Sequence, residues 1–317
     1  MQNNVEIKHM IPFKTQQMPS MLSKKSTSII LLCVVFTSVC IYGQDSISIH
    51  HGFNIAIKNF GLSFGNSPGI NGLRINIQDK NLQKVNGLNL TFWQPAKNSN
   101  SNSFINGIVS GIVPYAETIN GLGLGFGITG GQLNGIHIGI LGIGTDEGIN
   151  GIGIGGLGIG CDGDVNGVLI GGLGGGVDGN IKGLGFGLLG LGCDGDAKGL
   201  LIGGLGVGLD GNVKGLFIGG LGGGIDKKLT GVGIAGLGIG AGEEIKGMGI
   251  SLGKIQTKTF KGLGICSYSK FDNLFGISIS IFNRIKSLKG IELGLINYAG
   301  NNRKLFRVLP ILNMHFN

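Results

Sequence analysis

The chain has 317 residues, of which 67 are Gly and 6 are Pro, and its formal net charge is +8. Abundant Gly without a Gly-X-Y period excludes collagen, and a hydrophobic content of 42% excludes an intrinsically disordered chain. Charged residues make up only 13%, and no basic block with interleaved aromatics is present, so we expect no nucleic-acid partner. The composition predicts a regularly built, non-enzymatic protein.

Residues 1–43 have the pattern of an N-terminal extension and a secretory signal peptide. A pair of lysines at 24–25 precedes an apolar run over 29–42, and Gly43 follows it. A basic segment, an apolar segment and a small residue in this order predict cleavage after Gly43. The run is shorter than the roughly 20 apolar residues of a transmembrane helix. The pattern fits a start at Met1 or at Met21.

Residues 44–317 form one tandem repeat and are predicted to be a single domain. An Asn-Gly or Lys-Gly pair followed by an aliphatic residue recurs along them, and we call the residue before each repeated Gly the anchor. The anchors are Asn71, Asn86, Asn106, Asn120, Asn134, Asn150, Asn166, Lys182, Lys198, Lys214, Thr230, Lys246, Lys261, Phe275 and Lys289. From Asn134 to Lys246 the spacing is 16 residues without a break, and elsewhere it is mostly 14 or 15. The long gap after Asn86 predicts an inserted loop around Pro95. A fixed period of this kind indicates supersecondary units stacked side by side.

One repeat, 150–165, predicts an all-β fold. Ile152 and Ile154 alternate with Gly, as in a strand with one apolar face, and Asp162-Gly-Asp is turn chemistry. A helix is excluded, because each interior Gly costs about 1 kcal/mol relative to Ala. Each repeat is therefore extended chain followed by a turn.

Two architectures fit this repeat. In a β-solenoid each repeat is one coil of two short strands. The apolar alternation changes phase at Gly155-Gly156, and a turn there would let both halves point inward, Ile152 and Ile154 before it and Leu157 and Ile159 after it. In an antiparallel meander each repeat is one strand of a closed barrel.

A longer period of 32 residues favours the barrel. Repeats 150–165 and 182–197 share their Cys and Asp-Gly-Asp turns, whereas 166–181 and 198–213 share Asp-Gly-Asn turns. Duplication of a two-stranded β-hairpin would make alternate repeats resemble each other in this way. Repeats of 14–16 residues also match transmembrane strands of about 9–11 residues plus a turn. We therefore predict a transmembrane-type β-barrel of about 16–18 strands, with the β-solenoid as the alternative.

The C-terminal repeats resemble a known family. The segment Gly290-Ile-Glu-Leu-Gly-Leu-Ile-Asn-Tyr298 and the later Leu309-Pro-Ile-Leu-Asn313 are similar to the tandem GLQIGLIN-like units of surface-repeat outer-membrane proteins of gram-negative bacteria. The apolar segment 306–316, which ends in Phe, also resembles the closing strand of outer-membrane proteins. The resemblance implies a surface location and no known activity.

No residue in the sequence is assigned a catalytic, metal-binding or cofactor-binding role. The Asp-Gly turns match calcium-binding β-rolls poorly, since Asp recurs every 16 residues instead of every nine. Cys161 and Cys193 are two repeats apart, about 9.6 Å, which is too far for a disulfide, so they are expected to be packing residues. The histidines at 50–51, His137 and His315 form no triad with other groups.

These patterns together predict an exported protein of the outer membrane or cell surface. On the barrel interpretation its role is structural or passively pore-like, and its partners are outer-membrane lipid and the barrel-assembly machinery. On the solenoid interpretation it is a surface-displayed adhesin or scaffold that binds a partner. The sequence names no small-molecule ligand and no oligomeric state.

Overall fold

A computed structural model describes residues 52–94 and 102–316, which belong to one compact unit, Ile49–Asn317. Apart from one 3-10 turn, its regular structure is all β-strand. The elements are β1 (Phe53–Ile57), β2 (Phe60–Phe64), β3 (Gly69–Asn76), β4 (Lys84–Thr91), β5 (Phe104–Gly111), β6 (Tyr115–Gly155), β7 (Gly158–Cys161), β8 (Asp164–Gly171), β9 (Gly174–Val177), β10 (Ile181–Gly187), β11 (Gly190–Cys193), β12 (Ala197–Gly203), β13 (Gly206–Leu209), β14 (Val213–Gly219), β15 (Gly222–Ile225), β16 (Lys228–Ala235), β17 (Gly238–Ala241), β18 (Glu244–Ser251), β19 (Lys254–Ala299), η1 (Lys304–Phe306) and β20 (Val308–His315). The signal peptide, the paired histidines at 50–51 and most of the inserted loop lie outside the described residues.

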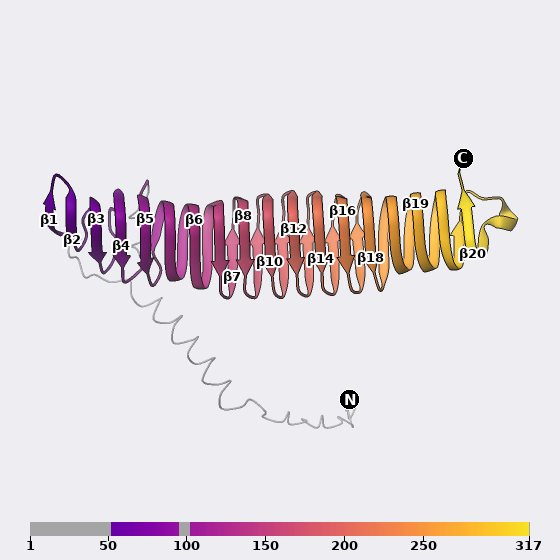
Figure 1. Ribbon diagram of the computed structural model, residues 1–317, viewed down its shortest axis with the longest axis horizontal. Helices are drawn as coiled ribbons and strands as arrows, with labels where there is room; N and C mark the ends of the chain where they lie inside the picture. Colours follow the sequence, from indigo (N-terminus) through magenta and orange to yellow (C-terminus); the bar gives the residue numbers. More distant parts are fainter. Residues whose placement is uncertain (1–51, 95–101, 317) are drawn as a thin grey trace, which may run out of the picture. The chain divides into compact units, whose positions relative to one another are not determined.

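The chain is a β-solenoid, and the predicted antiparallel barrel is wrong. Each long strand pairs in parallel with the long strand one repeat later, so that Lys182 of β10 lies beside Lys198 of β12. The short strands pair in the same way, as in β11 with β13. Figure 1 shows the coils side by side in one row. A meander would instead have joined successive repeats antiparallel. The alternative of one repeat per coil is therefore confirmed.

Turn residues decide whether a coil is broken into two strands. The 16-residue coils from Asn150 onward turn after the long strand, mostly at Gly-Gly, and most turn again at Asp-Gly, which separates strands such as β8 and β9. The repeat from Asn134, although 16 residues long, and several shorter repeats lack these turns, and β6 and β19 run through them as continuous strands of 41 and 46 residues. The inserted loop leaves the stacking intact, because Asn86 still pairs with Asn106.

A column of glycines runs through the whole stack, one directly after each anchor. These residues, Gly72, Gly87, Gly107, Gly121, Gly135, Gly151, Gly167, Gly183, Gly199, Gly215, Gly231, Gly247, Gly262, Gly276 and Gly290, have φ between 114° and 153°. Other residues rarely adopt this conformation. A Cβ at any of these positions would also lie well under 3.0 Å from the carbonyl oxygen of the equivalent glycine in the preceding coil. The repeated Gly is therefore required by both conformation and space.

We expect Gly199→Ala to destabilise the protein strongly and Gly208→Ala to have little effect. Both glycines lie in one coil, but Gly199 has φ +129° and faces the Gly183 carbonyl, whereas a Cβ at Gly208 meets nothing within 4 Å. Backbone strain alone costs roughly 1–3 kcal/mol, before the clash is added. Chemical denaturation followed by circular dichroism measures both. Equal stabilities of the two variants would contradict the role of the column.

The core lies between the long-strand and short-strand sheets, and it is thin. In the repeat 150–165 the inward positions are Gly153 and Gly155 on the long strand and Ile159 and Cys161 on the short strand. The predicted turn is present, but Ile152 and Ile154 point outward instead of inward. The expectation that both apolar halves fill the core is therefore wrong for the long strand. Because the two sheets approach closely, glycine fills much of the inward side.

Large and small core residues exchange sides between several of the coils. Where the long strand has an inward Gly the short strand has a large residue, as in Gly185 with Leu191. Where the long strand has Leu169 or Phe217 the short strand has Gly, whereas Leu201 lies opposite Val207. A Cβ at Gly223 would collide with the Phe217 ring, and one at Gly185 would lie 2.7 Å from Leu191 Cδ2. This alternation explains part of the 32-residue period, which we had interpreted as hairpin duplication. A solenoid does distinguish odd from even coils.

Hydrogen bonding between neighbouring turns also contributes to the 32-residue period, because Asp-Gly-Asp and Asp-Gly-Asn turns alternate. Asp164 Oδ1 accepts hydrogen bonds from the Asn180 backbone N–H at 2.8 Å and from its side-chain amide at 2.9 Å. Asn180 in turn accepts from the Asp196 backbone N–H, and Asp196 accepts from Asn212. These bonds lower the pKa of Asp164 and of Asp196, the Asn backbone donor being the larger cause and its side-chain amide the second. Asn between the two aspartates supplies donors and separates like charges.

We expect the exchange Gly185→Leu with Leu191→Gly to recover part of the stability that Gly185→Leu loses. The single change overfills the core, which typically costs about 1–3 kcal/mol, whereas the double change restores the volume on the opposite side. A double-mutant cycle in denaturant measures the coupling. Purely additive losses would contradict packing across the core between these two positions.

The two ends of the stack differ from its middle. At the N-terminal end β1 and β2 form an antiparallel hairpin, and at the C-terminal end β20 pairs antiparallel with the last part of β19. The segment predicted to close a barrel is thus a terminal strand of the solenoid. Near it, a chain of buried polar side chains links Ser269, Asn283, Asn297 and Asn313 through hydrogen bonds.

Candidate functional site

The long-strand sheet has an aliphatic outer surface, which we call the aliphatic face. It consists of the outward side chains two and four residues after each anchor. They are Leu73, Ile75, Leu88, Leu90, Ile108, Ser110, Leu122, Leu124, Ile136, Ile138, Ile152, Ile154, Val168, Ile170, Leu184, Phe186, Leu200, Ile202, Leu216, Ile218, Val232, Ile234, Met248, Ile250, Leu263, Ile265, Ile277, Ile279, Ile291 and Leu293. All are partly or fully exposed, and only Ser110 among them is polar. The face is continuous from coil to coil.

A row of leucines borders one edge of this face. In the 16-residue coils the turn after the long strand places one leucine at its tip. They are Leu157, Leu173, Leu189, Leu205, Leu221, Leu237 and Leu252, with exposed fractions of 47–82%. The turn backbone hydrogen-bonds from each coil to the next, as from Leu205 N–H to Leu189 O at 2.7 Å. The row is therefore held as rigidly as the sheet.

The anchors border the opposite edge, and their chemistry changes halfway along the stack. From Asn71 to Asn166 they are all Asn, and each side-chain amide donates to the Oδ1 of the preceding Asn at 2.5–3.0 Å. From Lys182 onward most are Lys, and Lys182, Lys198 and Lys214 are exposed. Each of them is the second residue of its long strand. One edge of the face is thus neutral in its first half and basic in its second.

Within residues 52–94 and 102–316 no carboxylate lies on the aliphatic face or in the leucine row, whereas at the anchor edge Glu244 pairs with the anchor Lys261 at 2.9 Å. Acidic side chains gather instead on the turns before the anchors, such as Asp178, Asp194 and Asp210. The sheet on the other side of the core bears mostly Gly at its outward positions, such as Gly176, Gly192 and Gly208. The large apolar side chains on the surface are therefore concentrated on the long-strand sheet and its leucine edge, and the acidic side chains on the turns before the anchors. Large exposed apolar patches of this kind mark interaction surfaces.

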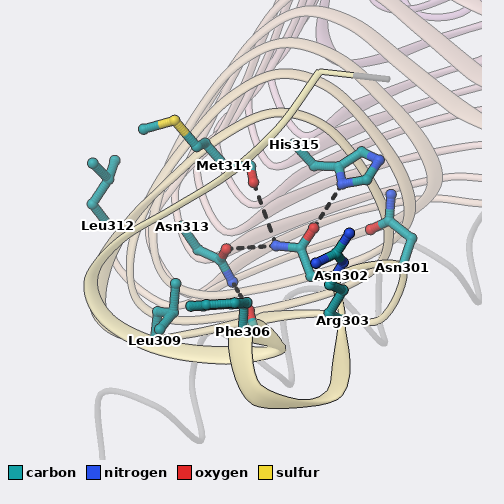
Figure 2. Close-up of a pocket in the computed structure, with 9 residues that line it drawn as sticks. All are labelled: Asn301, Asn302, Arg303, Phe306, Leu309, Leu312, Asn313, Met314 and His315. Atoms are coloured by element: carbon teal, nitrogen blue, oxygen red, sulfur yellow. Dashed lines mark hydrogen bonds between the residues drawn. The ribbon is translucent and has the colours of Figure 1, made fainter.

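A groove of about 690 Å³ lies at the C-terminal end, lined by residues of β20 and of the segment before it (Figure 2). Its polar groups bond mainly to one another. Asn302 donates to Asn313 Oδ1 at 2.7 Å, and the His315 ring nitrogen Nδ1 lies 2.6 Å from Asn302 Oδ1. Asn313 also bonds the Phe306 carbonyl. These bonds hold the terminal loop against the last coil and offer no arrangement suited to catalysis.

The cysteines within residues 52–94 and 102–316 are packing residues. Cys161, Cys193 and Cys266 are free and buried, as expected for packing residues. Burial raises the pKa of Cys161 and of Cys193 to about 11, so these thiols stay protonated.

The described part of the chain contains no group of three or more His, Cys, Asp or Glu suited to a metal ion. No helix in that part is long and apolar enough to cross a membrane.

The core contains polar residues that the repeat pattern does not predict. Arg74 is fully buried, pairs with Asp79 and donates to Asn89 Oδ1 at 3.0 Å. His137 is fully buried, and burial lowers its pKa. Glu292 is fully buried with neither carboxyl oxygen hydrogen-bonded, and burial raises its pKa to about 8. All occupy the inward position three residues after an anchor, so their place in the repeat was the available signal.

We expect Glu292→Gln to stabilise the protein more at high pH than at low pH. In the unfolded chain the carboxyl has a pKa near 4.5, whereas in the folded protein it is about 8. The folded state therefore loses stability as the pH rises from 4.5 through 8, and the full penalty is present above 8. Gln has nearly the same shape and no charge. Thermal unfolding of both proteins at pH 4 and pH 9 measures the difference. A difference in melting temperature that is independent of pH would contradict the buried-acid assignment.

A scan against protein-family models, a search of curated proteins and a search of solved structures found no match. The resemblance to the surface-repeat outer-membrane proteins therefore stays a prediction from residues 290–298 and 309–313.

Proposed function

We propose that this chain is an exported, non-enzymatic β-solenoid that acts as an adhesin or scaffold at the cell surface. It binds its partner through the aliphatic face. The observation that carries the proposal is the length of this face, which continues without a carboxylate across every repeat from Asn71 to Lys289. Monomeric soluble proteins rarely expose contiguous apolar patches larger than a few hundred Å². The signal-peptide pattern of residues 1–43 supports export.

A pore-like role depended on the barrel, and it loses its basis in the solenoid. The space between the two sheets is filled by side chains such as Leu169, Leu201 and Phe217, all buried. The described residues also bring together no catalytic constellation. Binding through a repetitive surface is the common use of solenoids, whose stacked repeats form extended contact areas.

We expect the chain on intact cells to be labelled by a membrane-impermeant biotin reagent and to be captured by an impermeant amine crosslinker in a larger adduct. Ile202→Lys should remove the adduct while leaving the labelling unchanged, because it places a charge in the middle of the aliphatic face. Gly208→Lys adds the same charge to the opposite sheet of the same coil, where a Cβ meets nothing within 4 Å. This control should keep the adduct.

Two outcomes would overturn the proposal. Absence of labelling on intact cells would remove the surface location. An adduct of equal yield in Ile202→Lys and in the native protein would remove the aliphatic face as the binding surface.

A further inference from the structure

The aliphatic face is the outer side of a parallel sheet, whose inner side is already covered by the core. Parallel sheets in proteins are ordinarily covered on both faces, because their strands are apolar on both sides. Here the inward positions are buried, whereas Leu200, Ile202 and their equivalents in the other coils remain partly or fully exposed. No element of the described chain covers this side of the sheet. The parallel sheet therefore has an apolar outer side without a partner within the described residues.

We propose that the second molecule is another copy of this chain, packed face to face and antiparallel across a two-fold axis between the coils of Asn166 and Lys182. The proposal rests on the proposed function and names the partner of the same surface. In this dimer the axis runs along the strand direction, so both anchor columns lie on the same side of the interface. The stack of one copy then runs opposite to that of its partner.

The first argument is the change in the anchor column at the middle of the stack. With the axis between Asn166 and Lys182, the neutral half of one copy faces the basic half of the other. The facing anchors are Asn166 with Lys182, Asn150 with Lys198, Asn134 with Lys214, Asn120 with Thr230, Asn106 with Lys246, Asn86 with Lys261, and Asn71 with Phe275. No Lys faces a Lys. The Asn Oδ1 atoms of the ladder each retain a lone pair that accepts from an ammonium.

The second argument is the area of the face. The stack from Gly72 to Gly290 contains fifteen rungs, and strands lie about 4.8 Å apart, which gives a length of roughly 67 Å. In the seven coils from Leu157 to Leu252 the width from the first aliphatic column to the leucine row is five residues, or about 16 Å, and elsewhere the face is narrower. Each copy thus offers at most about 1,100 Å², against the roughly 800 Å² per partner of a standard stable interface.

The third argument is the regular spacing of the side chains. Aliphatic rows recur at the strand spacing along the whole face, and a second sheet with the same spacing offers matching grooves. Two flat aliphatic sheets pack at about 10 Å with their strands nearly aligned, as in a β-sandwich. Any β-sheet offers this strand spacing, but a second copy also offers aliphatic side chains in the same columns over the same number of coils.

The mass of the purified full chain tests the interface. We expect light scattering coupled to size-exclusion chromatography to give twice the chain mass for the native protein and for Gly208→Lys. Ile202→Lys should give the mass of one chain, with unchanged circular dichroism and melting behaviour, since Ile202 is half-buried at the surface. A native monomer, or a dimer that survives Ile202→Lys, would overturn the proposal.

Crosslinking tests the antiparallel arrangement. Asn106→Cys and Lys246→Cys, mixed as two separate proteins, should form a mixed dimer that a short bismaleimide joins, because the two positions face each other across about 10 Å. Asn106→Cys alone should not crosslink, since its two copies lie nine rungs apart, roughly 43 Å. Cys161, Cys193 and Cys266 are buried and do not compete, and both proteins carry Cys33→Ser and Cys40→Ser, since these two cysteines lie in the predicted signal peptide. Crosslinking of Asn106→Cys with itself would contradict the proposed axis.

Vesicles separate a lipid partner from a second copy. A native monomer that floats with phosphatidylethanolamine–phosphatidylglycerol vesicles, when Ile202→Lys does not, would assign the aliphatic face to a membrane. That result would overturn the dimer and leave the proposed function standing. Loss of surface labelling on intact cells would instead remove the proposed function, whatever the mass of the purified protein.

Discussion

The close approach between one coil and the carbonyl oxygen of the coil before it is the constraint on which this structure depends. It occurs at the glycine after every anchor, from Gly72 to Gly290, and no side chain fits there. Because each of these glycines lies against the equivalent glycine of the previous coil, they fix the register of the stack. Once the register is fixed, each of the remaining positions of the repeat stacks on the equivalent position of the next coil and forms a column. The side chains of each column then determine the chemistry of one strip of the surface or core.

The sequence revealed the columns but not the direction of the strands. The spacing of 16 residues from Asn134 to Lys246 and the turns at Asp-Gly were enough to predict extended chain, the turn positions and the inserted loop. A repeat length, however, is the same for a coil and for a hairpin strand. The 32-residue period misled us because it arises from packing across the core, as between Gly185 and Leu191. That contact depends on the distance between the two sheets, and this distance cannot be deduced from the repeat length.

The sequence also did not reveal which side of the long strand faces the core. Alternation of Ile152 and Ile154 with Gly identifies a strand with two unlike faces, and the apolar face is normally the inner one. Here the sheets are so close that Gly153 and Gly155 occupy the inner side, and the isoleucines lie outside. The buried Glu292 and His137 were missed for a related reason. Each occurs in a single coil and departs from its column, so only its position three residues after an anchor indicated that it faces inward.

A stack of equivalent coils restricts which side chains each column tolerates. Polar columns need donors and acceptors that match along the axis, and the Asn ladder and the alternating Asp164, Asn180, Asp196 and Asn212 provide them. Lys columns provide donors but no acceptors, so neighbouring Lys side chains cannot hydrogen-bond to one another, and Lys182, Lys198 and Lys214 are exposed. Aliphatic columns cover each other only along the stack, so the side that points away from the sheet stays exposed however many coils are added. Lengthening the solenoid therefore enlarges the uncovered apolar area in proportion, and only contact outside the chain removes it from water.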